Sequence, residues 1–140
     1  WEKALRLMEN VIRQENGSLD SYLNYIFLLE TIVLYADFEM PEFNEAEKNI
    51  PIVYAAAKEK YADNPDFLFW SGWLATWCDW LFKIELRDAE LLMLKAYVMC
   101  PENKLFELAM SEYFSKYGFA QSSIIFRINA LKSSGAVLFV

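Results

Sequence analysis

The 140-residue chain contains no histidine, and this absence removes several classes of enzyme chemistry at once. Nucleophile–histidine triads, general acid–base catalysis by imidazole and histidine-containing zinc sites all need a residue that the chain lacks. The two cysteines, Cys78 and Cys100, are too few for a four-ligand zinc site or a disulfide framework. We therefore expect a protein that is not an enzyme, with no catalytic residues and no metal site.

Glycine and proline are also scarce, with four of each. The glycines, Gly17, Gly72, Gly118 and Gly135, lie too far apart to form a phosphate loop or a dinucleotide-binding fingerprint. No cofactor is expected for this reason. The hydrophobic fraction of 56% and the aromatic fraction of 17% argue against a disordered or low-complexity chain. The sequence predicts one folded domain with a substantial core.

Basic residues are the minority, with 13 Lys and Arg against 20 Asp and Glu, which gives a net charge of −7. Nucleic acids and anionic membrane surfaces are bound through clustered Lys and Arg, so we expect neither as a partner. An acidic surface suits a basic protein partner. It also keeps an apolar chain in solution, and both interpretations stay open at this point.

Strand-like alternation is nearly absent, and long stretches with helical periodicity alternate with short breakers. We predict an all-α fold of about seven antiparallel helices, arranged either as an α-solenoid or as a compact helical bundle. Residues 1–140 form a single domain in this prediction. Its expected parts are an N-terminal helix at 1–16, helix pairs at 18–62, 66–100 and 102–134, and the start of a further helix at 136.

A tryptophan-rich stretch at 66–84, DFLFWSGWLATWCDWLFKI, organises this prediction. Trp70, Trp73, Trp77 and Trp80 recur at steps of three, four and three, which places them on one face of a continuous helix. A helix that is apolar around most of its circumference is expected at the centre of a bundle. The expected polar strip consists of Gly72, Thr76, Asp79 and Lys83, with Asp79 and Lys83 spaced to form an ion pair. The stretch is short for a membrane span and contains Asp79, so a core helix is expected instead.

Two units resemble the tetratricopeptide repeat, a family of paired helices that stack into solenoids. In the tryptophan-containing unit, Ala89, Ala96 and Pro101 have the consensus spacing. In the next unit, Gly118, Ser123, Ala130 and Leu131 fall at consensus offsets. The tryptophan helix is about one turn too long for the family, and Gly72 stands too far from Ala89. The resemblance implies close helix packing and an interaction function.

Two sets of residues are candidates for partner binding. The first is a run of five carboxylates, Asp37, Glu39, Glu42, Glu45 and Glu47. It is interpreted as a partner-facing acidic patch or as a solvated loop and helix start, while its spacing lacks the glycine and ligand order of a calcium loop. The second set is Trp70, Trp73 and Trp77, which form either a core stripe or part of an aromatic groove.

Glu85, Asp88 and Glu90 are close enough in sequence to suggest an acid–base pair. Asp88 also has the features of a residue at a helix start, and the structural interpretation is preferred. A small-ligand-binding protein or a carboxylate-based enzyme using a tryptophan-lined cavity remains the alternative from another functional class.

The functional prediction is a non-catalytic interaction protein with a basic protein partner and an unspecified oligomeric state. Its size, acidity and lack of catalytic motifs resemble small bacterial immunity proteins, which implies that it neutralises a cationic toxin such as a nuclease. An adaptor or co-chaperone module cut from a longer solenoid is the alternative within the same class. The charged, amphipathic start and the two cysteines in apolar stretches favour a cytoplasmic location. Trp1 without a preceding Met suggests that the natural chain begins earlier.

Overall fold

The computed structural model describes residues 1–116, and the structure reported below is that of this part of the chain. It confirms an all-α fold. The described helices are α1 (Glu2–Gln14), α2 (Leu19–Tyr35), α3 (Pro41–Tyr61), α4 (Pro65–Ala75), α5 (Asp79–Phe82), α6 (Leu86–Met99) and α7 (Lys104–Lys116). The second half of the predicted pair at 102–134 and the predicted start of a further helix at 136 lie outside the described residues.

Side-chain caps begin three of the helices. Ser18 Oγ accepts a hydrogen bond from the Ser21 amide at 3.2 Å at the start of α2. Asn64 and Asn103 cap α4 and α7 in the same way, each accepting from two backbone amides of the first turn. Before α2, Asn16 and Gly17 both have a positive φ, which turns the chain sharply after α1. These short polar breaks define the ends of the helices.

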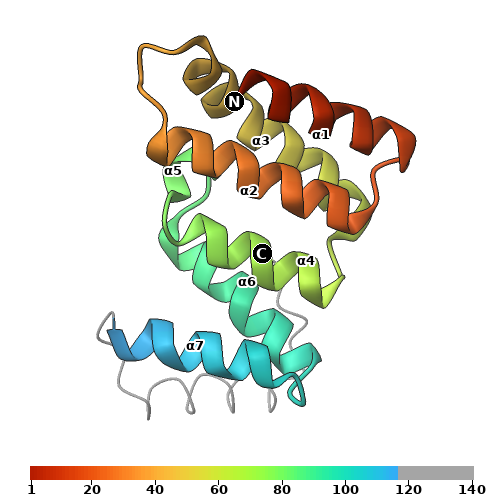
Figure 1. The fold of residues 1–140 in the computed structure, drawn as a ribbon. Helices are drawn as coiled ribbons and strands as arrows, with labels where there is room; N and C mark the ends of the chain where they lie inside the picture. Colours follow the sequence, from red (N-terminus) through yellow and green to blue (C-terminus); the bar gives the residue numbers. More distant parts are fainter. Residues whose placement is uncertain (117–140) are drawn as a thin grey trace.

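The long helices alternate in direction, as Figure 1 shows. The helices α1, α3 and α6 run roughly one way, and α2, α4 and α7 run the opposite way, with the single turn of α5 placed between α4 and α6. The helices form a stack in which α2 packs on α3 and α4 packs on α6. This up-and-down order follows from the short connections, which allow only antiparallel neighbours.

The helix α4 lies at the centre of the stack and contributes to both parts of the core. Phe67, Leu74 and Ala75 belong to the hydrophobic cluster formed with α1, α2, α3 and α5. Leu68 and Phe69 belong to the cluster formed with α6 and α7. The ring of Phe69 stacks on Phe106 of α7 with the centroids 4.2 Å apart. The prediction that the tryptophan stretch supplies the central helix is therefore confirmed for its first half.

The prediction of one continuous helix over 66–84 is wrong. The helix α4 ends at Ala75, and α5 begins only at Asp79. Thr76 Oγ1 donates to the Trp73 carbonyl at 2.6 Å, and the Thr76 amide bonds to the carbonyls of both Gly72 and Trp73. These bonds close the last turn of α4, after which Cys78 has non-helical backbone angles, with a φ of −152° and a ψ of 54°. The chain then turns so that α6 can return along α4.

The expected polar strip of the tryptophan stretch is also wrong. Gly72 is buried, and a Cβ placed there would lie 2.7 Å from the carbonyl oxygen of Ala89. The glycine therefore allows the backbones of α4 and α6 to approach closely. Lys83 ends α5 in a left-handed conformation with a φ of 55°, and the described ion pairs do not include one with Asp79.

The third helix begins with a proline. Pro41 occupies the first helical position of α3, where a missing amide proton is harmless. Pro51 lies inside α3, and the helix continues through it to Tyr61. Glu42 and Glu45 consequently lie within the first two turns of α3.

Candidate partner-binding surface

Two of the predicted tryptophans meet at a cavity between α2 and α4. The cavity has a volume of about 310 Å³ and is lined by Asp20, Leu23, Asn24, Phe27, Trp70, Trp73 and Leu74. The helix α2 contributes the residues of its first two turns, and α4 contributes those of its second half. Three aromatic rings and one carboxylate therefore surround one opening at the surface.

Trp77 and Trp80 do not line this cavity, and both follow the break after Ala75. The side chain of Trp77 is 46% exposed and contacts Trp73 edge-on, with the ring centroids 6.4 Å apart. Lys116 Nζ lies 5.9 Å from the centroid of the Trp77 ring. Trp80 is exposed on α5. The predicted row of four tryptophans is thus divided between a cavity and an outer surface.

A stripe of α2 continues from this cavity toward the other end of the helix. Asp20, Asn24, Phe27, Thr31 and Leu34 recur at steps of four, three, four and three, so they share one side of the helix. We call this stripe the α2 face. All of its members are exposed except Thr31, which is half-buried, and Phe27 is 58% exposed. The α2 face spans about 21 Å from Asp20 to Leu34 at the helical rise of 1.5 Å per residue.

The α2 face ends at the connection to α3, where Asp37 and Glu39 lie. We call residues 36–40 the acidic connection. Its two carboxylates are exposed, and Asp37 Oδ1 accepts a hydrogen bond from the Glu39 amide at 3.0 Å. Beside them Tyr35 is 78% exposed and Phe38 is 71% exposed. Large exposed apolar side chains gathered between acids are typical of protein-binding surfaces.

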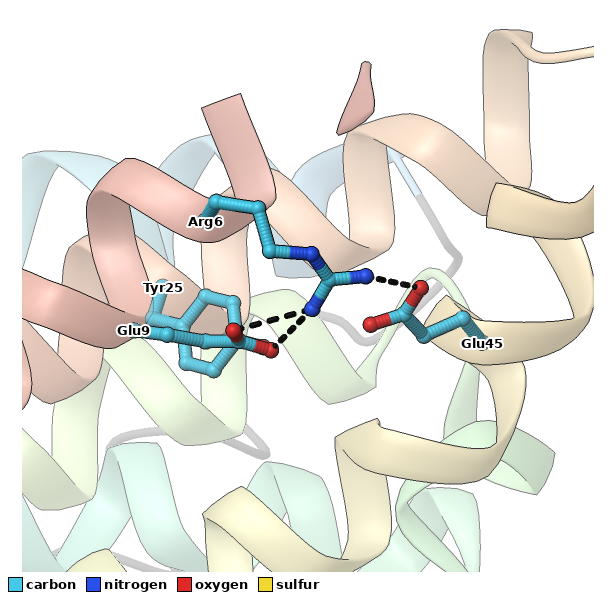
Figure 2. Close-up of polar contacts among 4 residues, drawn as sticks. All are labelled: Arg6, Glu9, Tyr25 and Glu45. Atoms are coloured by element: carbon cyan, nitrogen blue, oxygen red, sulfur yellow. Dashed lines mark hydrogen bonds and ion pairs between the residues drawn. The ribbon is translucent and has the colours of Figure 1, made fainter. Parts of the chain in front are cut away.

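The other three carboxylates of the predicted patch lie on α3 and have different surroundings. Figure 2 shows Glu45 bound to Arg6 of α1, with Arg6 Nη2 2.8 Å from Glu45 Oε2. The same guanidinium donates to both oxygens of Glu9, at 2.8 and 2.9 Å. Hydrogen bonds to these carboxylates raise the pKa of Arg6 above its already high value. Glu45 is therefore paired with Arg6 and links α3 to α1.

Tyr25 of α2 also contacts this network, through Glu9. Its hydroxyl lies 3.4 Å from Glu9 Oε1, and burial together with the charge of Glu9 raises the pKa of Tyr25 to about 12. Glu42 is half-buried, and one of its carboxylate oxygens is buried without a hydrogen-bond partner, whereas Glu47 is exposed. Of the five predicted acids, Asp37 and Glu39 are the two that lie together with exposed aromatic residues.

One carboxylate that the sequence did not single out belongs to α2 and is buried. Glu30 is only 4% exposed, and the Cys78 thiol lies 3.2 Å from Glu30 Oε1 and 3.5 Å from the Leu74 carbonyl. Burial raises the pKa of Glu30 to about 7, and the hydrogen bond from Cys78 opposes part of that rise. Burial, followed by the charge of Glu30, raises the pKa of the Cys78 thiol well above its ordinary value. The thiol is therefore a poor nucleophile.

The three carboxylates near the start of α6 have separate environments. Glu85 is the exposed N-cap residue of α6, and Asp88 lies half-buried in its first turn. Glu90 is buried, and Tyr113 of α7 donates a hydrogen bond to its Oε1 at 3.2 Å. None of the three lines the tryptophan cavity, which contains one carboxylate, that of Asp20.

Phe27, Leu34, Tyr35 and Phe38 are surface residues that the sequence analysis did not select. The signal was present, because α2 is apolar on nearly all sides while α1, α3 and α4 cover only part of its circumference. Periodicity alone does not show which of those sides faces solvent. That assignment depends on where α3 and α4 pack.

Two further properties concern the described residues as a set. No group of three or more Cys, Asp and Glu residues within 1–116 comes together in a way that could hold a metal ion. None of the helices in this part of the chain combines the length and the apolar character needed to cross a membrane.

Comparisons with known proteins give no relative on which to base a function. No protein-family model matches the chain, and no curated protein or solved structure is similar to it.

Proposed function

We propose that this protein is a non-catalytic binding protein that receives a basic protein partner on the α2 face and the acidic connection. The observation that carries the proposal is the placement of Tyr35 and Phe38, both largely exposed, beside the carboxylates of Asp37 and Glu39, which form no ion pair with another residue of 1–116. Exposed aromatic anchors supply binding energy, and the carboxylates favour a cationic partner over an anionic one.

The dimensions of the surface fit a single partner. A standard interface covers about 800 Å² on each protein, which corresponds to a patch roughly 30 Å across. The α2 face accounts for about 21 Å of that length, and the acidic connection follows it directly in the chain. One partner can therefore contact the cavity at one end of α2 and the exposed aromatic residues at the other.

Within this class, the proposed role is inhibition of a cationic toxin such as a nuclease, as in small immunity proteins. The support is the acidic charge of −7 and the exposed apolar and acidic surface of α2. A carboxylate-based enzyme is a weaker proposal, because the tryptophan cavity is lined by one carboxylate, and acid–base pairs need two groups in reach of one substrate.

The test is co-expression with the product of the adjoining reading frame, with cell growth as the measurement. We expect that product to be basic and to stop growth when expressed alone, and we expect this chain to restore growth. Phe38→Asp should abolish the rescue. Leu108→Asp, which changes an equally exposed apolar residue on α7, should leave it intact.

Two outcomes would contradict the proposal in different ways. A harmless or non-binding neighbour would reject toxin neutralisation. Equal behaviour of the Phe38 and Leu108 variants would show that the partner binds elsewhere.

A further inference from the structure

The cavity between α2 and α4 has the chemical features of a cation site. Phe27, Trp70 and Trp73 supply three aromatic rings, and Leu23 and Leu74 complete an apolar lining. Aromatic faces carry a negative quadrupole that attracts cations, most strongly for the indole ring. Among the described residues of the lining, Asp20 is the ionised side chain, and its carboxylate is negative.

The polar groups of this lining are available to a ligand. Asp20 is exposed and lies in the first turn of α2, yet its carboxylate forms no hydrogen bond or ion pair within the described residues. Asn24, one turn further along, is likewise exposed and forms no side-chain hydrogen bond with another described residue. Capping of α2 is performed by Ser18, which leaves Asp20 free of that role.

The volume of the cavity restricts the size of its occupant. At about 310 Å³ it lies at the lower end of the range for small-molecule sites, which is roughly 300–1,000 Å³. A single long side chain fits this space better than a nucleotide-sized cofactor. Arginine combines a planar, weakly hydrated cation that stacks on indole rings with donors that reach a carboxylate.

We propose that the α2–α4 cavity receives an arginine side chain of the basic partner, with the guanidinium against Trp70 and Trp73 and paired with Asp20. This inference rests on the proposed function and specifies which chemical group of the partner is recognised. The acidic connection contacts a separate part of the same partner. Loss of either contact can therefore be measured independently of the other.

The test is a titration of the full chain with the peptide acetyl-Gly-Arg-Gly-amide, following the indole N–H signals of Trp70 and Trp73 by nuclear magnetic resonance. A matched peptide with citrulline, which has nearly the same shape without the charge, serves as the reference. We expect millimolar binding of the arginine peptide, as a single side chain permits, and at least tenfold weaker binding of the citrulline peptide.

Variants inside and outside the cavity make the result specific. Asp20→Asn and Phe27→Ala should each weaken arginine binding about three- to tenfold, as expected for one partly exposed ion pair or ring contact. Glu59→Gln and Leu108→Ala, which change exposed residues of α3 and α7 that do not line the cavity, should leave it unchanged. Thermal unfolding of each variant checks that the fold is retained.

Several results would overturn the inference. These are equal binding of the citrulline peptide, unchanged affinity in Asp20→Asn, or tighter binding of free tetramethylammonium than of the arginine peptide. If the basic partner binds but is insensitive to Asp20→Asn and Phe27→Ala, the cavity assignment fails and the proposed function stands. If no basic partner binds while the arginine peptide does, the proposed function fails alone.

Discussion

At the scale of single residues, the least expected feature is a buried carboxylate on α2. Glu30 is 4% exposed, and its described hydrogen-bond partner is the Cys78 thiol, a weak donor. Burial of a carboxylate disfavours its ionised form, which is the cause of the raised pKa of about 7. Glu30 therefore changes charge near neutral pH in the folded protein and near its ordinary value of 4.5 in the unfolded chain.

This difference makes stability depend on pH. Between pH 4.5 and 7 the folded state keeps a proton on Glu30 that the unfolded state has lost, so the free energy of unfolding falls as pH rises. Glu30→Gln removes this dependence and should stabilise the protein at pH 8 by about 1–2 kcal/mol, allowing for partial solvent screening. Urea unfolding of both proteins at pH 4.5 and pH 8 measures the effect. A Glu30→Gln variant that is equally destabilised at both values would contradict it.

The tryptophans differ in how much of each ring the fold covers. Trp73 is half-buried and contacts Phe69, Trp77 and Tyr113, whereas Trp77 is 46% exposed. Trp73→Ala should therefore lower the free energy of unfolding by about 2–4 kcal/mol, and Trp77→Ala by about 1 kcal/mol. Chemical denaturation of the two variants provides the comparison. Equal losses would show that the rings contribute equally to the core.

At the scale of elements, periodicity placed the limits of the segments 1–16, 18–62 and 66–100 within two residues of helix ends. It failed at the tryptophan stretch, because apolar spacing continues through Thr76 and Cys78 although the backbone leaves the helix there. Gly72 and Ala89 are separated by more residues than the tetratricopeptide consensus allows. The residues of α5 account for part of this excess. The excess was therefore a sign of the break, which periodicity alone does not reveal.

Some of the binding residues could be predicted from local sequence patterns, and others could not. Runs of aromatic and acidic residues could be found from the sequence, and Trp70 and Trp73 do lie together at the cavity. The pairing of Glu45 with Arg6 joins residues 39 positions apart, and no local pattern predicts it. Contacts between distant segments depend on how the helices stack, which is why Asp20 and Phe27 were missed as cavity residues.

The close approach of α4 and α6 leads to a prediction at this scale. A Cβ at Gly72 would lie 2.7 Å from the Ala89 carbonyl and 3.0 Å from Leu92 Cβ, so the two helices would have to separate. Gly72→Ala should lower the free energy of unfolding by about 1–3 kcal/mol, although alanine favours helix formation by about 1 kcal/mol.

The control for this variant is Ala55→Gly at an exposed site of α3, where the loss should be about 1 kcal/mol from helix propensity alone. Differential scanning calorimetry measures both variants. A Gly72→Ala protein that is more stable than the original would show that the helices are not in close contact at this position.

At the scale of the whole molecule, the charges are arranged so that some hold the fold together and others remain available. Arg6 uses Glu9 and Glu45 to connect α1 with α3, and Lys95 pairs with Asp63 at 3.3 Å. The carboxylates of Asp37 and Glu39 form no ion pair within the described residues. The field of the acidic connection is therefore not cancelled locally, and it can act on an approaching cation.

The last prediction concerns the rate at which a basic partner associates. Long-range attraction accelerates encounter, and salt weakens it because the Debye length falls to about 8 Å at physiological ionic strength. Asp37→Asn with Glu39→Gln should lower the association rate about three- to tenfold at low salt and flatten its salt dependence. Stopped-flow mixing with the partner at several salt concentrations measures both effects.

The control is Glu59→Gln with Glu112→Gln, which removes the same charge from exposed sites of α3 and α7 and should change the rate much less. Equal effects of the two double variants would show that net charge alone attracts the partner, and that the acidic connection does not determine where the partner binds.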